Sequence, residues 1–152
     1  MTTTRHIYAK CPKCGKIIFT EEVMSTNVMG HGLNYEPHTG GTDPKRLAVL
    51  ACPKCEYTDY QSQFKEIKRE ERGEKVGFDT TPTNIKYFRI GEKLKKKKEY
   101  KNALWAFLTS SWYSSAEFKK KCLLNVLDLI IKSFESEKLR KEEKIDLLNL
   151  GL

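Results

Sequence analysis

The chain has 152 residues, of which 39% are hydrophobic and 32% are charged, with a formal net charge of +8. This length accommodates one domain or two small ones. The longest apolar runs are much shorter than the roughly 18 residues needed to cross a bilayer, and the N-terminus lacks the apolar core of a secretory signal. We therefore expect a cytoplasmic protein without a membrane span.

Two Cys-Pro-Lys-Cys motifs, at residues 11–14 and 52–55, are the most informative feature of the sequence. Two residues between the cysteines allow a tight turn, so that both sulfurs face one ion about 2.3 Å away. A redox dithiol would explain one pair only, and two disulfides would require an oxidising compartment. The motifs predict one structural Zn²⁺ ion, with iron as the less favoured metal. The predicted ligands are Cys11, Cys14, Cys52 and Cys55.

Short apolar and β-branched segments flank both motifs. Residues 5–10 and 16–23 are predicted to be strands around the first motif, and residues 47–51 and 57–60 strands around the second. Three or four short antiparallel strands closed by a metal form a zinc ribbon. Because so small a sheet buries little apolar surface, metal binding would supply part of its folding energy.

Residues 25–46, between the motifs, contain four glycines and two prolines without sustained periodicity. This composition predicts a long inserted loop. Its two histidines, His31 and His38, are expected to be exposed loop residues and not metal ligands.

Residues 61–72 read as a charged helix with Phe64 and Ile67 as its apolar anchors. Glycines then interrupt the pattern. We therefore expect a first domain over residues 1–73, which contains the ribbon, the loop and this helix, and a linker over residues 74–81.

The second expected domain, residues 82–152, is helical. Thr81 is a suitable N-cap and Pro82 suits the first helical position. Cys122 lies in an apolar stripe and is expected to be buried. The last helix could cover the preceding helices or bind a second copy of the chain. The predicted helices occupy about residues 84–94, 103–112, 115–134 and 138–150. The fold class is therefore α+β.

The first two helices resemble a single tetratricopeptide repeat. Gly91 and Ala103 stand twelve residues apart, as in that family's motif, where small residues let the paired helices approach closely. Ser115 replaces the closing proline of the repeat, and no second copy follows. The other matching residues are Tyr87, Ile90, Leu94, Tyr100, Phe107 and Ser110. Such hairpins bind proteins through their helix faces.

The combined layout resembles a prokaryotic family catalogued as domain of unknown function 2225. Its members join two Cys-Pro-x-Cys knuckles to tetratricopeptide-like helices. The matching features here are the two motifs, Tyr57, Phe64 and residues 103–113, whereas Glu56 stands where the family usually has glycine. The resemblance implies the architecture and the metal site, and it implies no activity.

The chain lacks a phosphate-binding glycine loop, a nucleophile elbow and the metalloprotease His-Glu-x-x-His motif. A four-thiolate site also leaves no coordination position for substrate. We therefore predict that the protein is not an enzyme, with no catalytic residues and no organic cofactor. The expected function is that of an adaptor, which docks a protein partner through its helical hairpin and ribbon.

The alternative function is binding to RNA, DNA or a ribosome, because residues 65–101 hold thirteen Lys and Arg side chains against seven Asp and Glu. Four glutamates interleave with the first of these basic residues, a pattern more typical of a solvated surface. Tyr57, Tyr60, Tyr87 and Phe88 are candidate stacking residues. The candidate phosphate contacts are Lys65, Lys68, Arg69, Arg72, Lys86, Arg89, Lys93, Lys95, Lys96, Lys97, Lys98 and Lys101.

Overall fold

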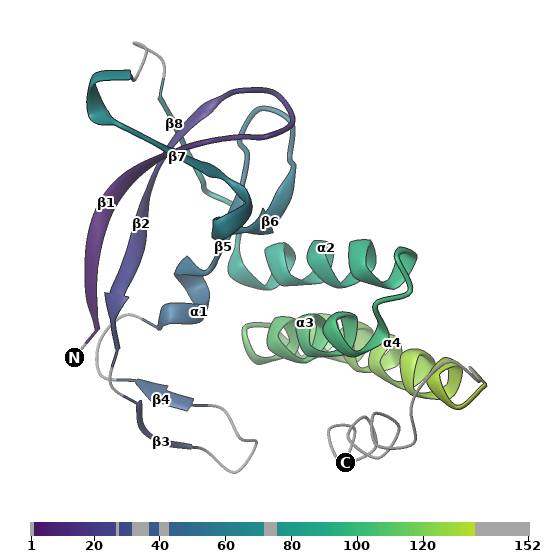
Figure 1. The fold of residues 1–152 in the computed structure, drawn as a ribbon. Coiled ribbons are helices and arrows are strands. Elements are labelled where there is room, and N and C mark those ends of the chain that lie inside the picture. The colour runs from purple at the N-terminus through teal and green to yellow at the C-terminus, as the bar shows by residue number, and fades with distance from the viewer. Residues whose placement is uncertain (1, 27, 32–36, 40–42, 72–75, 136–152) are drawn as a thin grey trace. The chain divides into compact units, whose positions relative to one another are not determined.

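The computed structural model describes residues 2–26, 28–31, 37–39, 43–71 and 76–135 (Figure 1). The chain divides into two compact units, Met1–Pro82 and Thr83–Leu152. The first contains the strands and both cysteine motifs, and the second contains helices, which confirms the α+β class predicted from the sequence.

A four-stranded sheet forms the largest part of the first unit. Its strand order is β7-β1-β2-β8, with β1 antiparallel to β2 and β7, and β8 parallel to β2. Alternate residues Ile7 and Ala9 of β1, with Ile18 of β2, are buried on one face. The strands are β1 (Thr3–Lys10), β2 (Ile17–Ser25), β7 (Lys65–Ile67) and β8 (Gly77–Phe78).

A short hairpin, β5 (Val49–Ala51) with β6 (Thr58–Tyr60), carries the second cysteine motif at its turn. Leu50 of β5 belongs to the same buried cluster as Ala9 and Ile18. The four strands predicted around the motifs are thus present. Strand β5 begins two residues later than predicted, because Leu47 ends a helical turn, α1 (Pro44–Leu47).

The region predicted as an irregular loop, residues 25–46, is more structured than expected. It contains α1 and a two-stranded ladder of β3 (Val28–His31) with β4 (Pro37–Thr39). The sequence signal that was missed is a helix start, in which Pro44 is the first helical residue and Asp43 accepts a hydrogen bond from the Lys45 backbone N–H at 2.9 Å.

The prediction of a charged helix over residues 61–72 is wrong. Residues Gln61–Gln63 and Arg69–Glu71 form single 3₁₀ turns, and β7 lies between them. Pairing with the edge of β1 gives this segment backbone hydrogen bonds that local propensity could not anticipate. Phe64 is buried, as predicted, and its ring centroid lies 5.7 Å from that of Tyr57.

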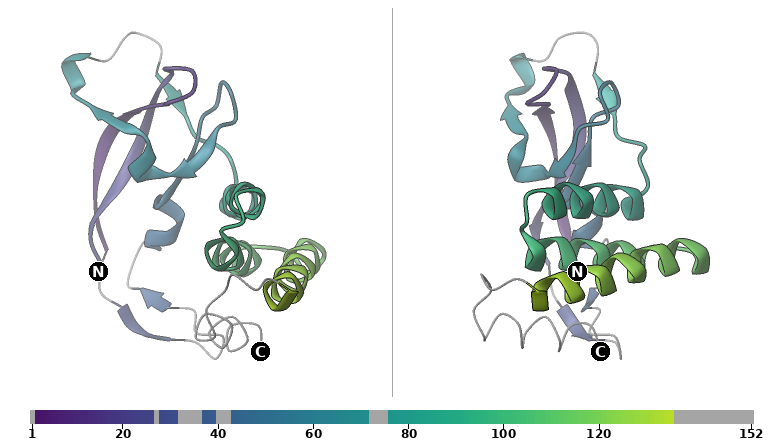
Figure 2. Two further views of the ribbon diagram at one scale, coloured as in Figure 1. Left: turned by 45° about the vertical axis from the view of Figure 1, so that its right-hand side comes forward. Right: turned by 90° about the vertical axis from the view of Figure 1, so that its right-hand side faces the viewer.

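The second unit contains α2 (Thr83–Lys96), α3 (Tyr100–Trp112) and α4 (Ala116–Glu135). Helix α3 packs against both α2 and α4 (Figure 2). Three predicted helices are therefore confirmed, with α2 starting one residue after Pro82. The predicted helix over residues 138–150 lies outside the described residues. Among the described helices, none is long and apolar enough to cross a membrane.

The core of the helical unit is built from one side of each helix. Phe88 of α2 meets Phe107 of α3 edge to face, with ring centroids 5.3 Å apart. Cys122 is fully buried in α4, as predicted. The remaining buried members of this cluster are Ala103, Leu104, Val126 and Leu129.

Candidate metal centre

The two cysteine motifs adopt the same backbone turn. In the first, the Gly15 N–H donates to the Cys11 carbonyl at 3.0 Å and the Cys11 N–H donates to the Lys16 carbonyl at 2.9 Å. In the second, the Glu56 N–H donates to the Cys52 carbonyl at 2.9 Å and the Cys52 N–H donates to the Tyr57 carbonyl at 2.9 Å. Repeating the turn places both sulfurs of each motif on the same side of the backbone.

The four cysteine sulfurs converge on one point. The Cys11 and Cys55 sulfurs lie 3.7 Å apart, the Cys14 and Cys52 sulfurs lie 3.5 Å apart, and all four lie within 4.8 Å of one another. These separations are far longer than a disulfide bond of about 2.05 Å. Four thiolates about 2.3 Å from a tetrahedral zinc ion would lie about 3.8 Å apart. The donor set therefore fits a metal ion such as zinc.

The protonation of the thiols differs across the cluster. Burial raises the pKa of Cys52 to about 12 and also raises the pKa of Cys11. A hydrogen bond from the Lys16 backbone N–H lowers the pKa of Cys14 to about 7. Because a metal ion binds thiolates, binding must release the protons that the buried thiols hold in its absence, and metal affinity is expected to rise with pH.

The cluster lies at the edge of the first unit's core. Cys11 and Cys52 are buried with the apolar side chains of Ala9, Ile18, Leu50 and Phe64, whereas Cys14 and Cys55 are half-buried. An ion at this site would join β1, β2, β5 and β6 through four bonds.

The family assignment rests on the match of residues 6–122 to the family model described as "Uncharacterized protein conserved in bacteria (DUF2225)". The chain belongs to the DUF2225 family. The match covers both cysteine motifs and reaches the beginning of α4, which confirms the resemblance seen in the sequence. No curated protein and no solved structure matches this DUF2225 chain significantly. The tetratricopeptide-like character of α2 and α3 remains a prediction.

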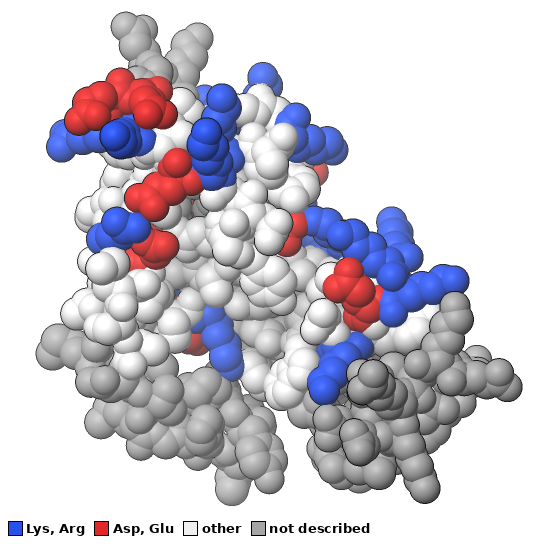
Figure 3. All heavy atoms as spheres, viewed as in Figure 1, with Lys and Arg blue, Asp and Glu red and all other residues white. Residues whose placement is uncertain are grey.

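The predicted phosphate contacts do not all lie in one unit. Lys65, Lys68 and Arg69 belong to the first unit, those from Lys86 to Lys101 belong to the second, and Arg72 lies outside the described residues. Lys86 is only 7% exposed. Within each unit, the face drawn in Figure 3 shows acidic side chains next to basic ones.

The predicted stacking residues are also mostly engaged elsewhere. Tyr87 and Phe88 are buried in the helical unit, and Tyr57 packs on Phe64. Tyr60 is 37% exposed at the end of β6. A different group of aromatic side chains, on the four-stranded sheet, is open to solvent, and the sequence analysis did not identify it.

Proposed function

We propose that this DUF2225 protein is a non-catalytic zinc-binding adaptor, which docks a protein partner through its helical unit. The zinc assignment is supported by the four sulfurs, which lie within 4.8 Å of one another and of which two pairs are 3.7 and 3.5 Å apart, close to the edge of a tetrahedral zinc site. Four protein ligands complete the coordination of zinc, so that no position is left for water or substrate. The ion would then stabilise the first unit and take no part in a reaction.

The observation that carries the docking proposal is an apolar stripe on α4. Leu124, Leu127 and Ile131 are spaced at intervals of three and four residues, which places them on one face of the helix. Each is between 52% and 59% exposed. The opposite face, with Cys122, Val126 and Leu129, is buried in the core. Helix α4 is therefore apolar on two faces, although only one packs against the described helices.

An exposed apolar stripe of this kind matches the way in which amphipathic helices bind apolar grooves of partner proteins. We name Leu124, Leu127 and Ile131 the leucine stripe. The candidate partner is a protein with an apolar surface, and binding should resist high salt because apolar contacts are insensitive to screening.

The alternative of nucleic-acid binding along the whole segment 65–101 has less support. Lys86 is buried, and the Lys95 amino group lies 2.7 Å from the Asp128 carboxylate, so neither is placed as a free phosphate contact. The basic residues also belong to two separate units.

The test compares the tagged wild-type protein with a variant in which Leu124, Leu127 and Ile131 are replaced by serine. Both are used to capture partners from native lysate at high salt with nuclease present. We expect a defined protein to bind the wild type directly when purified, and to be lost with the variant. A Lys119→Ser variant, which changes an exposed residue of the same helix, should retain the partner.

Identical partner sets for all three proteins would contradict the proposal. If the leucine stripe instead binds a second copy of the chain, sedimentation equilibrium would show a dimer for the wild type and a monomer for the triple variant. That outcome would also contradict docking of a different protein.

A further inference from the structure

The four-stranded sheet has a second face, which does not contribute to the core around the metal centre. Because side chains alternate along a strand, His6 and Tyr8 of β1 lie on the face opposite to the buried Ile7 and Ala9. Tyr8 pairs with Phe19 of β2, and Phe19 pairs with Phe78 of β8. Three aromatic residues therefore stand in register across three neighbouring strands.

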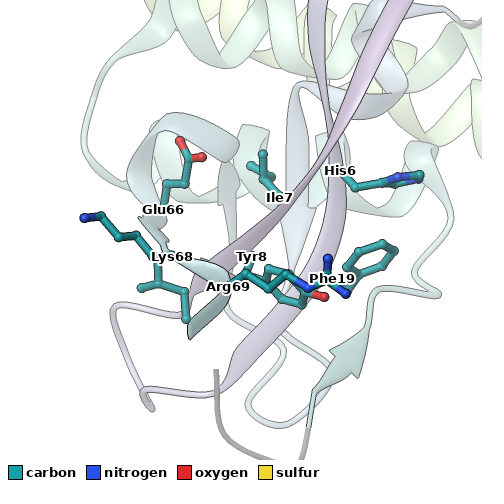
Figure 4. Close-up of a pocket in the computed structure, with 8 residues that line it drawn as sticks. His6, Ile7, Tyr8, Phe19, Glu66, Lys68 and Arg69 are labelled. Atoms are coloured by element: carbon teal, nitrogen blue, oxygen red, sulfur yellow. The ribbon is translucent and has the colours of Figure 1, made fainter. Parts of the chain in front are cut away.

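The rings of this row are in contact. The Tyr8 and Phe19 centroids are 5.4 Å apart, and those of Phe19 and Phe78 are 5.8 Å apart. The His6 ring stacks on Phe19 with a centroid distance of 5.1 Å and an interplanar angle of 24°. Figure 4 shows the His6 and Phe19 rings side by side. We call His6, Tyr8, Phe19 and Phe78 the aromatic row.

The aromatic row is accessible to a ligand. Phe78 is 63% exposed, the His6 side chain is 65% exposed, and Tyr8 and Phe19 are half-buried. Three members of the row, His6, Tyr8 and Phe19, line an open pocket of about 460 Å³ together with Ile7 and residues 66–69 (Figure 4). Soluble proteins rarely expose contiguous apolar patches, and those that they expose often bind a ligand or a partner. A row of rings that the protein's own core does not cover is therefore a candidate binding surface.

Basic side chains lie beside the β1 end of the row. Lys10 and Lys65 form a cross-strand pair two residues along from the Tyr8 and Ile67 pair, and both are exposed. Lys68 and Arg69 line the pocket. Two acidic side chains lie nearby. Arg5 donates to Glu66 at 3.2 Å, and the Glu21 carboxylate lies 3.3 Å from the His6 ring. Glu70 and Glu71 follow Arg69 and are exposed, so they offset part of the positive charge of Lys68 and Arg69.

We propose that this face of the sheet binds single-stranded nucleic acid. Unpaired bases would stack on Tyr8, Phe19 and Phe78, while Lys10, Lys65 and Arg69 contact the phosphates. Base stacking on aromatic side chains tolerates any base, since every base has a π-face. A duplex would bind less well because its bases are already stacked on one another. This site is separate from the leucine stripe, and neither proposal requires the other.

The experiment measures fluorescence anisotropy of a labelled uridine oligonucleotide of about 12 nucleotides, a length within the range that one such module covers. The full-length, metal-loaded protein is titrated at about 50 and about 200 mM salt, and affinity should fall about 20-fold between them if three phosphates are neutralised. The same titration with thymidine DNA tests whether RNA or DNA is preferred. A duplex competitor should compete at least tenfold less well.

The decisive variants are Tyr8→Leu and Phe78→Leu, which keep apolar side chains and remove the rings. Each should weaken binding about tenfold or more, as expected for loss of one stacked base. Arg69→Gln, which changes an exposed side chain, should lower the salt slope by about 0.7. Trp105→Leu is the matched control, because Trp105 is an exposed aromatic residue of α3 outside the aromatic row, and it should bind as the wild type does.

Thermal melting and the metal content of each variant show whether it is folded. The proposal is wrong if the wild type fails to bind either oligonucleotide at low salt, or if Phe78→Leu and Arg69→Gln both bind like the wild type. It is also wrong if duplex and single strand bind equally, since charge alone would then explain the affinity. Binding of the aromatic row to a protein in place of an oligonucleotide would overturn it as well.

Discussion

Gly15 and Glu56 occupy the same position in the two metal-binding turns, and both have positive φ, at 71° and 55°. Each donates its backbone N–H to the carbonyl of the first cysteine in its motif. Glycine adopts this left-handed conformation without cost, whereas a residue with a Cβ pays about 1 kcal/mol or more. The second turn is therefore strained at Glu56, and the first is not.

Replacing Glu56 with glycine should stabilise the metal-loaded protein by about 0.5–1 kcal/mol, because it relieves this strain. The measurement is the urea midpoint of the first unit, followed by backbone NMR. Glu56→Ala keeps a Cβ and should give no gain. The reverse change, Gly15→Ala, should destabilise the protein by a similar amount, because alanine pays the cost of the positive φ. The added Cβ would meet only Lys10 Cε at 3.6 Å, an ordinary contact that adds no steric cost. Equal effects of glycine and alanine at position 56 would show that strain is not the cause.

Removing one metal ligand should unfold the first unit and spare the helices. Cys52→Ser leaves three thiolates, so the protein should lose the ion and the stabilisation that it provides. Elemental analysis measures the metal, and hydrogen exchange resolved by peptide compares β1 and β2 with α2 and α3. Cys122→Ala is the matched control, because Cys122 is a buried cysteine outside the cluster and its variant should keep the metal. Full metal occupancy in Cys52→Ser would rule out the four-thiolate site.

Gly91 is required for close packing between α2 and α3. A Cβ at this position would lie 2.8 Å from Cε1 of Phe107, a ring that is fully buried. Gly91→Ala should therefore destabilise the helical unit by about 1–3 kcal/mol, although alanine is the better helix former by about 1 kcal/mol. Both tryptophans of the chain lie in α3, so their fluorescence during denaturation reports on this unit.

A smaller side chain in place of the Phe107 ring should offset part of the effect of Gly91→Ala. Adding Phe107→Leu to this variant makes space for the new methyl group, so the double variant should lose less than the two single losses combined. Strict additivity would mean that the two residues are not in steric conflict.

The sequence predicted those features that depend on local patterns. Both cysteine motifs carry their ligands at a fixed spacing, and the helical stripe around Phe107 and Cys122 identified the second core. Glu56 was recognised as a departure from glycine, but its positive φ was not foreseen.

The features that sequence analysis missed depend on pairing between distant segments. Strand β7 exists because residues 65–67 meet the edge of β1, and no local pattern specifies that register. Gly77 was interpreted as an interruption of the helical pattern. A Cβ there would lie 2.7 Å from Pro53 Cγ, so glycine allows β8 to approach the second cysteine motif closely. The alternation of His6 and Tyr8 was visible in the sequence. Their alignment with Phe78 could not be predicted, because it depends on the parallel pairing of β8 with β2.

Asp128 of α4 connects two helices through its carboxylate. The Lys95 amino group of α2 lies 2.7 Å from its Oδ2 atom, and the Lys132 amino group lies 3.0 Å from the same atom. These hydrogen bonds, that of Lys95 first, lower the pKa of Asp128 below its ordinary value of 3.8. Since the folded-state pKa is lowered, the stabilisation is present above the ordinary pKa and is lost as pH falls through the lowered value.

Asp128→Asn should therefore cost about 0.5 kcal/mol at neutral pH, a modest amount because the carboxylate is partly exposed and screened by solvent. The difference from the wild type should remain constant down to about pH 5 and shrink below the ordinary pKa. Tryptophan fluorescence is the suitable readout, because it follows the helical unit even when acid removes metal from the first unit. Lys95→Gln should show the same pH profile, and the double variant should lose little more than either single one. A cost that persists unchanged at low pH would show that Asp128 stabilises the protein by packing and not by its charge.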